Sequence, residues 1–212
     1  MVEIELKLTG TPAVLAQVLT LPALQPLCTG TAHAQPLLSR YYDTPALALR
    51  RHGLALRLRQ TPQGWVQTLK SRGSLEAGIA VRQELESPSD GHTLDFSGIG
   101  DEALRTFLQS PEVGPCLVPC FVTDFERIAQ RLDCPDGSVV ELDLDRGEVR
   151  SGSRRAPIAE IELELVAGRR DALTDLASLL QAHLPLAPST LSKAERGYQL
   201  LTAGTKEGIE WT

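Results

Sequence analysis

The stretch Glu3-Ile4-Glu5-Leu6-Lys7 opens the chain and decides how the rest of it is interpreted. Its charged side chains alternate with apolar ones, so a β-strand places two carboxylates and an ammonium group on one face. Ile4, Leu6 and Leu8 then share the other face. A strand whose charged face lies in water gives the same pattern. The motif by itself therefore leaves its role open.

Length, composition and charge exclude several classes of protein. The 212 residues are 42% hydrophobic and 23% charged, and the net charge is −6. These values are typical of a globular protein of one large or two small domains, and they provide no broad basic face for nucleic acid. No apolar run approaches the ~18 residues that span a membrane. Because the chain starts on a charged strand and not on a signal peptide, we expect a cytoplasmic protein that binds neither membranes nor nucleic acid.

The residues that usually hold zinc or form disulfides have no informative spacing. The four cysteines include no CxxC pair, and the four histidines are scattered. We therefore expect free thiols and no thiolate zinc site. The sequence also has no GxxxxGK[ST] loop and no GxGxxG turn, so phosphate chemistry would need another device.

The opening pattern recurs along the chain. Alternation of charged and apolar residues predicts further strands at Leu54–Arg59, Trp65–Lys70, Ile79–Glu86, Val139–Asp145 and Ile158–Val166. Two other strands are predicted at Leu37–Tyr42 and Phe121–Leu132. Glycine, proline and polar residues predict turns at 61–64, 135–137 and 146–147.

Helices are fewer. Thr11-Pro12 predicts the start of a short helix, and Asp43-Thr44-Pro45 predicts a brief helical turn. Longer helices are expected at about Asp101–Gln109 and Asp171–Leu184. A last helix should open at Ser192, where Glu195 completes a capping box.

These elements predict an α+β fold, an eight-stranded antiparallel sheet closed into a barrel with helices packed on its outside. The charges indicate which face points inward, because their signs are sorted by strand. Arg57 and Arg59 stand together, and three carboxylates stand together on each of the strands around Asp143 and Glu162. Like charges two residues apart repel one another, so such clusters call for a ligand of opposite charge.

The two kinds of cluster call for two kinds of ligand. Carboxylates suit Mg²⁺ or Mn²⁺, and arginine and lysine side chains suit phosphate groups. A lumen with both walls is therefore predicted to bind a metal-bound polyphosphate.

The ordered set of motifs resembles the CYTH domain, also called the triphosphate tunnel metalloenzyme family, and is most similar to its bacterial inorganic triphosphatases. The resemblance extends from about Val2 to Leu201. Its motifs are Glu3-x-Glu5-x-Lys7, Tyr41-Tyr42-Asp43-Thr44-Pro45, Leu56-Arg57-Leu58-Arg59, Thr68-Leu69-Lys70, Arg82/Glu84/Glu86, Arg127, Leu144-Asp145, Glu160-x-Glu162-x-Glu164 and Ser192-Lys193-Ala194-x-Arg196-Gly197-Tyr198.

The resemblance implies a single tunnel domain over residues 1–203, followed by a tail or the start of a linker at 204–212. It implies hydrolysis of the terminal phosphoanhydride of inorganic triphosphate (tripolyphosphate), with Mg²⁺ or Mn²⁺ as cofactor, by a monomer or a homodimer. In relatives a helical CHAD domain often follows. None is present in this sequence, so we expect either a protein without it or a chain that is part of a longer one.

The resemblance also implies roles for individual residues. The metal ligands would be Glu3, Glu5, Glu162 and Glu164, with Asp145 as a further ligand. Glu141, Asp143 and Glu160 are weaker candidates, because their neighbours could fill the same role from the same face. Catalysis would depend on Glu5, Lys7, Glu162 and Glu164. The phosphates would be bound by Lys7, Arg57, Arg59, Lys70, Arg82, Arg127, Lys193 and Arg196. For Arg82, pairing with Glu84 or Glu86 is an equal alternative.

Other functions remain open on the same scaffold. Thiamine triphosphatases and class IV adenylyl cyclases resemble this chain through the same strands, although only Trp65 suggests a ring that could stack on a base. A non-catalytic polyphosphate- or nucleotide-binding module, and a scaffold whose charged strands face water, are the alternatives from other classes.

Overall fold

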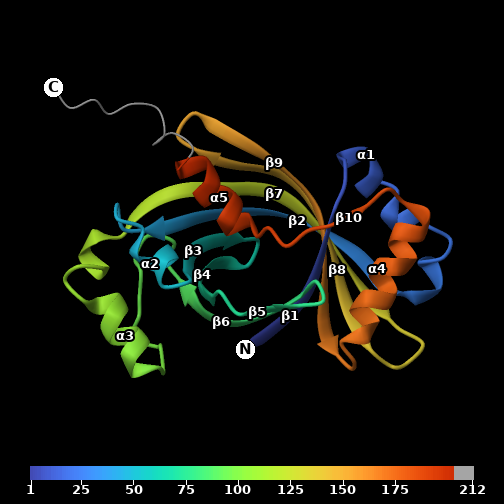
Figure 1. The fold of residues 1–212 in the computed structure, drawn as a ribbon, viewed down its shortest axis with the longest axis horizontal. Helices are drawn as coiled ribbons and strands as arrows, with labels where there is room; N and C mark the ends of the chain where they lie inside the picture. Colours follow the sequence, from blue (N-terminus) through green and yellow to red (C-terminus); the bar gives the residue numbers. More distant parts are fainter. Residues whose placement is uncertain (203–212) are drawn as a thin grey trace.

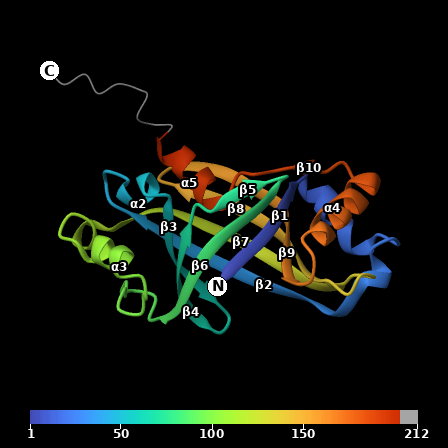
Figure 2. The ribbon, with the colours of Figure 1, turned by 60° about the horizontal axis from the view of Figure 1, so that its bottom comes forward.

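Strand β1 (Val2–Thr9) pairs on one side with β9 (Arg154–Ala167) and on the other with β6 (Ile79–Ser89), and this double pairing closes the sheet. The computed structural model describes residues 1–202. Around the ring the order is β1, β9, β8, β7, β2, β3, β4 and β6, and every pairing is antiparallel. The predicted eight-stranded closed barrel is confirmed (Figures 1 and 2).

The strands are longer than the sequence patterns indicate. The remaining barrel strands are β2 (Cys28–Asp43), β3 (Leu54–Thr61), β4 (Gly64–Ser71), β7 (Val118–Asp133) and β8 (Val139–Ser151). Two short strands, β5 (Ser74–Glu76) and β10 (Ala187–Pro188), pair with β6 and β1.

Helices lie on the outside of the barrel, as expected. They are α1 (Pro12–Leu15), α2 (Ala48–Arg51), α3 (Glu102–Gln109), α4 (Asp171–His183) and α5 (Lys193–Thr202). Figure 1 shows α1 and α4 at one end, α2 and α3 at the other, and α5 along the barrel between them. Short 3₁₀ turns occupy Val18–Thr20, Gln25–Leu27 and Gly114–Cys116.

Three apolar cores hold the helices against the described strands, and two of them lie on the outer faces of the barrel. One joins Leu173, Leu176 and Leu180 of α4 to apolar residues of β1, β8 and β9 such as Leu8 and Leu163. The other packs α2 and α3 on β3 and β4.

A third core packs Tyr198 of α5 on inward-facing apolar residues of β2 and β7, such as Tyr41 and Phe121. On the strands covered by the first two cores the apolar face points outward, so the alternating charged residues face the lumen.

Capping residues start three of the described helices, and the sequence predicts two of these caps, at Thr11 and Ser192. Thr11 accepts a hydrogen bond from the backbone of Val14, and Asp101 accepts one from Leu104. At α5 the hydroxyl of Ser192 and the carboxylate of Glu195 form the reciprocal bonds of a capping box. Helix α1 ends at Leu15, shorter than expected, and a 3₁₀ turn follows it.

The turn predicted at Arg146-Gly147 is wrong, because β8 continues through both residues to Ser151. Gly147 pairs with Phe125 inside the sheet, where a Cβ would overlap the backbone of Asp124. The glycine therefore allows a close approach of two strands, and the real turn contains Gly152 at φ 56°.

The predicted tail at 204–212 lies outside the described residues. Within residues 1–202, no helix has the length and apolar character needed to cross a membrane.

Candidate functional site

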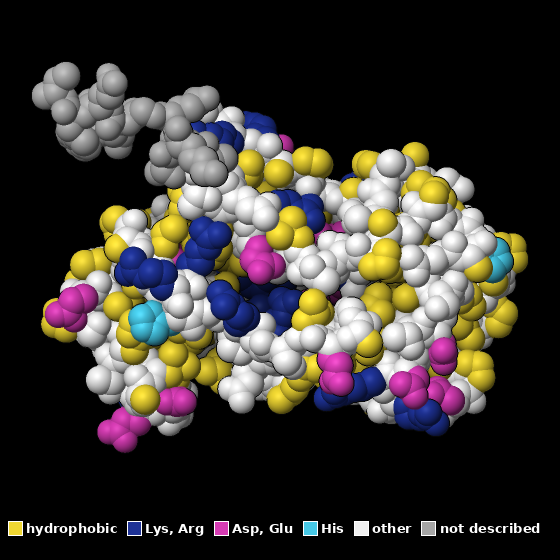
Figure 3. All heavy atoms as spheres, in the orientation of Figure 1, with side chains coloured by type: hydrophobic (Ala, Val, Ile, Leu, Met, Phe, Trp, Pro, Cys, Tyr) yellow, Lys and Arg dark blue, Asp and Glu magenta, His cyan; other side chains and the backbone are white. Residues whose placement is uncertain are grey.

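The barrel encloses a cavity of about 910 Å³ lined by side chains of both signs. Figure 3 shows the opening, where Lys and Arg side chains fill the hollow in the middle of this face. The charged residues of the lining are Glu3, Glu5, Lys7, Arg50, Arg57, Arg59, Lys70, Arg72, Arg82, Glu84, Glu86, Arg127, Glu162, Glu164, Lys193 and Glu195. Most residues predicted for the site are therefore brought together here.

The register of the strands explains why carboxylates gather on one wall. Glu5 lies opposite Glu164, and Asp145 lies opposite Glu160. Such directly opposed pairs place Cβ atoms about 5 Å apart, and like charges at that distance destabilise a sheet. Their presence in a buried lumen means that cations must compensate them.

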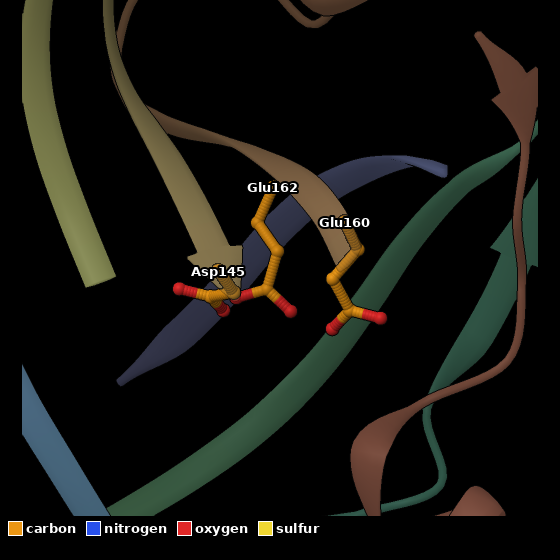
Figure 4. A group of neighbouring side chains, drawn as sticks. All are labelled: Asp145, Glu160 and Glu162. Atoms are coloured by element: carbon orange, nitrogen blue, oxygen red, sulfur yellow. The ribbon is translucent and has the colours of Figure 1, made fainter. Parts of the chain in front are cut away.

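The most compact acidic group consists of Asp145, Glu160 and Glu162, each with a carboxylate oxygen within 4.8 Å of the others (Figure 4). Arg127 and Lys193 each bridge members of this group, and Lys7 and Arg196 each pair with one member. Arg127 contacts Asp145 at 2.6 Å and Glu162 at 2.5 Å, and it also pairs with Asp143. Lys193 contacts Asp145 and Glu160 at 2.5 Å and Glu162 at 2.8 Å.

The proton affinities of this group follow from the ion pairs. Burial opposes ionisation of Glu162, but the charges of Lys193, Lys7 and Arg127 outweigh it and hold the pKa of Glu162 well below its usual value. Burial likewise opposes the charge of Lys193, yet the surrounding carboxylates raise the pKa of its ammonium group. Both groups therefore stay ionised in the lumen.

The opening strand forms a second part of the wall. Glu3 pairs with Lys70 at 2.8 Å, Glu5 pairs with Arg82 at 2.8 Å, and Lys7 pairs with Glu162 at 2.8 Å. Glu5 also lies 3.6 Å from Lys7. The ion pair of Arg82 with Glu84 or Glu86 that the sequence suggested is not formed, and Arg82 pairs instead with Glu5 on the neighbouring strand. Its role as a phosphate ligand stays a prediction.

Glu164 differs from Glu3, Glu5, Glu84 and Glu162, because it forms no ion pair within the described part of the chain. Burial, together with the charges of Glu3, Glu141 and Glu84, raises the pKa of Glu164 to about 7. The Oε2 atom of Glu3 is buried without a hydrogen-bond partner. Crowded, incompletely paired carboxylate oxygens on a cavity wall fit a hard divalent cation.

The basic wall contains a cation with no carboxylate partner. Arg59 donates one hydrogen bond, to the hydroxyl of Ser39 at 3.0 Å, and forms no ion pair among residues 1–202. Burial and the nearby charges of Arg57 and Arg127 lower the pKa of Arg59 to about 9. Arg57 is only loosely held, at 3.4 Å from both Tyr41 and Glu84. An anion in the cavity would satisfy both guanidinium groups.

Two predicted residues lie behind the cavity lining. Arg196 donates to the carbonyl of Pro157 at 2.6 Å and to Glu160 at 2.9 Å, and it is not part of the lining. Asp145 is fully buried, with both oxygens engaged by Arg127. Trp65 packs in the outer core under Arg40, away from the cavity, so it offers no stacking ring there.

The sequence analysis missed several lining residues. The carboxylate of Glu84 forms ion pairs with Lys70 at 2.9 Å and with Arg57 at 3.4 Å, and it therefore links the two cations. Its position on the charged face of β6 was the available signal. Tyr41 and Arg50 also line the cavity, and no charge alternation marked them.

The model of the CYTH domain matches residues 1–198. The chain belongs to the CYTH domain family. It is 33% identical over 212 residues to an inorganic triphosphatase of Haemophilus influenzae, covering 99% of this chain and 57% of that protein. The chain thus spans little more than half the length of this relative.

Solved structures share the fold. A Hippeastrum protein described as a candidate adenylyl cyclase with a dominant triphosphatase activity has a TM-score of 0.62 and 22% identity, with 95% of this chain and 96% of that chain covered. A candidate adenylate cyclase of Bacillus halodurans has a TM-score of 0.56 and 17% identity, with 90% and 94% covered. At these identities the likeness concerns the architecture.

Proposed function

We propose that this CYTH domain hydrolyses the terminal phosphoanhydride of inorganic triphosphate in a reaction that depends on Mg²⁺ or Mn²⁺. The observation that carries the proposal is the lining of one cavity by unpaired or weakly paired guanidinium groups and by crowded carboxylates. Arg59 needs an anion, and Glu164 needs a cation. A metal-bound polyphosphate supplies both.

The acidic wall suits the cofactor. Glu3, Glu5, Glu162 and Glu164 line the cavity and would hold Mg²⁺ or Mn²⁺, which neutralises phosphate charge and acidifies a bound water. Asp145 would join them only if Arg127 and Lys193 released its oxygens. In this proposal Glu5 or Glu164 would accept a proton from the attacking water, since both line the cavity.

The basic wall would bind and orient the phosphates. Lys7, Arg57, Arg59, Lys70, Arg82, Arg127 and Lys193 all line the cavity. Phosphoryl transfer depends mostly on positioning and on stabilising charge in the transition state. A rigid barrel that holds these cations before substrate arrives provides both, because little reorganisation is then needed.

Phosphate release tests the proposal directly. The purified protein should release orthophosphate from tripolyphosphate with Mg²⁺ or Mn²⁺, and a chelator should abolish the release. Glu5→Gln and Lys7→Ala should each lower kcat/KM at least about a hundredfold while circular dichroism stays unchanged. Glu148→Gln, a surface change next to Arg155, is the matched control. No release with either metal would refute the proposal.

The same assay separates the alternatives. Because solved structures with this fold include proteins described as adenylyl cyclases, a nucleotide is an alternative substrate. Thiamine triphosphate is a second alternative. Rates of phosphate release from tripolyphosphate, thiamine triphosphate and ATP should favour tripolyphosphate, because the aromatic residues of the lining are only Tyr41 and Tyr198 among those described. Tight binding of tripolyphosphate without turnover would instead identify a binding module.

A further inference from the structure

Glu160 has a different environment from Glu162, although both belong to the compact acidic group on β9. Glu160 is fully buried and does not line the cavity, whereas Glu162 is partly exposed and does. A ligand that enters the cavity therefore meets Glu162 first. Lys193, which contacts Glu160, also lines the cavity.

Both carboxylate oxygens of Glu160 already have cationic partners. Oε1 lies 2.5 Å from the ammonium of Lys193, and Oε2 lies 2.9 Å from the guanidinium of Arg196. Lys193 and Arg196 are three residues apart on α5 and so lie on one helix face. Arg196 is itself fixed by the carbonyl of Pro157 on the same strand. Glu160 thus fastens the first turn of α5 to β9.

The position of Lys193 argues against a metal ion at Glu160. Lys193 forms ion pairs with three carboxylates, Asp145, Glu160 and Glu162, and donates a hydrogen bond to Glu162. Its contact with Oε1 of Glu160 is ionic, because this oxygen has no hydrogen-bond partner among the described residues. The charge of Lys193 therefore occupies the centre of the group that otherwise suits a metal. Glu162 shares Lys193 and also pairs with Lys7 and Arg127, but it lines the cavity, where an entering metal ion can reach it. A divalent cation bound at Glu160 would have to displace Lys193 inside a fully buried site, where like charges repel strongly.

We infer that Glu160 is a positioning residue that holds Lys193 toward the cavity, with Arg196 as its second counter-ion, and that it does not ligate the catalytic metal. The inference rests on the proposed function for the role of Lys193. It divides the acidic group in two. Glu162 faces the ligand, and Glu160 supports a cation that faces the ligand.

Metal binding is the first test and needs no turnover. Mn²⁺ binding to the metal-free protein, followed by electron paramagnetic resonance, should change less than about twofold in Glu160→Gln. Glu162→Gln, on the same strand and face, is the matched control and should weaken Mn²⁺ binding at least about tenfold. Equal weakening by both variants would overturn the inference.

The hold on Lys193 is the second test. In metal-free protein labelled with ¹⁵N-lysine, the ammonium signal missing from Lys193→Met should be visible in the wild type and broadened by faster hydrogen exchange in Glu160→Gln. Arg196→Met should broaden it less, because it removes only the second partner of Glu160. An unchanged signal in Glu160→Gln would contradict the positioning role.

Kinetics connects the residue to the reaction. Glu160→Gln should lower kcat for tripolyphosphate about tenfold and change KM less than about threefold, because the lost carboxylate charge offsets weaker phosphate contacts. In the Lys193→Met background the same substitution should have almost no further effect. A full effect in that background would show that Glu160 does not act through Lys193. An inactive wild type would refute the proposed function, and the two metal-free tests would still decide the role of Glu160.

Discussion

Arg59 shows at the scale of one residue how this barrel trades stability for a binding site. Its guanidinium is partly buried beside two other guanidinium groups, and its one hydrogen bond among the described residues goes to Ser39. Burying a charge without an ionic partner costs free energy in the folded state. Folding alone therefore gives no reason for an arginine here, but an anionic ligand does.

Replacing Arg59 separates the two effects. Arg59→Met should raise the free energy of unfolding by about 1 kcal/mol or more, because it removes a partly buried, unpaired charge and keeps much of the volume. The same change should weaken tripolyphosphate binding at least about tenfold. Chemical denaturation and calorimetric titration measure the two quantities. Arg155→Met, at an exposed pair with Glu148, is the control and should alter neither. A destabilised Arg59→Met would show that Arg59 is structural.

Glu164 predicts a pH dependence of stability in the metal-free protein. Its pKa is raised from 4.5 to about 7, chiefly by burial and then by the charge of Glu3. The folded state therefore holds this proton more tightly than the unfolded state. The resulting stabilisation is complete below pH 4.5 and is lost as the pH rises through 7.

The matching variant removes that titration. Glu164→Gln should have the Tm of the wild type at pH 5 within a few degrees and a higher Tm at pH 8.5, measured with a chelator present. Glu148→Gln should follow the wild type at both pH values. A Glu164→Gln curve parallel to that of the wild type would mean that this carboxyl is already ionised at pH 5.

At the scale of one element, α5 connects the outer shell of the barrel to its lumen. Gly197 lies against the ring of Phe121, which a Cβ would overlap. One residue later the hydroxyl of Tyr198 donates to the buried carboxylate of Asp43 at 2.8 Å. Asp43 also accepts backbone hydrogen bonds from Thr44, Leu49 and Arg50. These contacts at the middle of α5 fix the position at which Lys193 enters the cavity.

A methyl group at position 197 should disturb the packing of α5 against Phe121. Gly197→Ala should lower the free energy of unfolding by about 1–3 kcal/mol through overpacking, despite the better helix propensity of alanine. It should also lower kcat/KM for tripolyphosphate, because Lys193 shifts with the helix. Gly98→Ala, where the added Cβ meets open space, is the control and should leave both unchanged. A Gly197→Ala variant more stable than the wild type would show that the ring of Phe121 moves aside without a loss of packing energy.

At the scale of the whole molecule, the alternation of charged and apolar residues was sufficient to predict a closed barrel with a charged lumen. Period-2 patterns fix which face is buried, and hairpin turns fix the neighbours. Partner choice inside the lumen was not predictable. The sequence places Arg196 and Lys193 in one motif, yet only the packing of α5 turns Lys193 toward the cavity and Arg196 toward Pro157.

The structural role of Gly147 was not predictable for a similar reason. Arg146-Gly147 has the composition of a turn, but the close approach of Asp124 requires a residue without a Cβ in the middle of a strand. Sequence statistics of turns reflect backbone freedom, and a tight strand contact uses the same property. Only the long-range pairing of β7 with β8 distinguishes the two uses.

The position of the cavity lining within the described residues leads to a prediction about the whole chain. Every described residue that lines the cavity lies between Met1 and Tyr198, and the CYTH model matches residues 1–198. The Haemophilus influenzae relative is considerably longer. We therefore propose that residues 1–203 form an autonomous domain. A chain ending at Ala203 should keep its Tm within a few degrees and its kcat/KM for tripolyphosphate within about twofold. Ending the chain at Ser192 is the contrasting variant. It removes α5 with Lys193 and Tyr198 and should abolish turnover. Loss of activity in the chain ending at Ala203 would place part of the site or its support beyond the barrel.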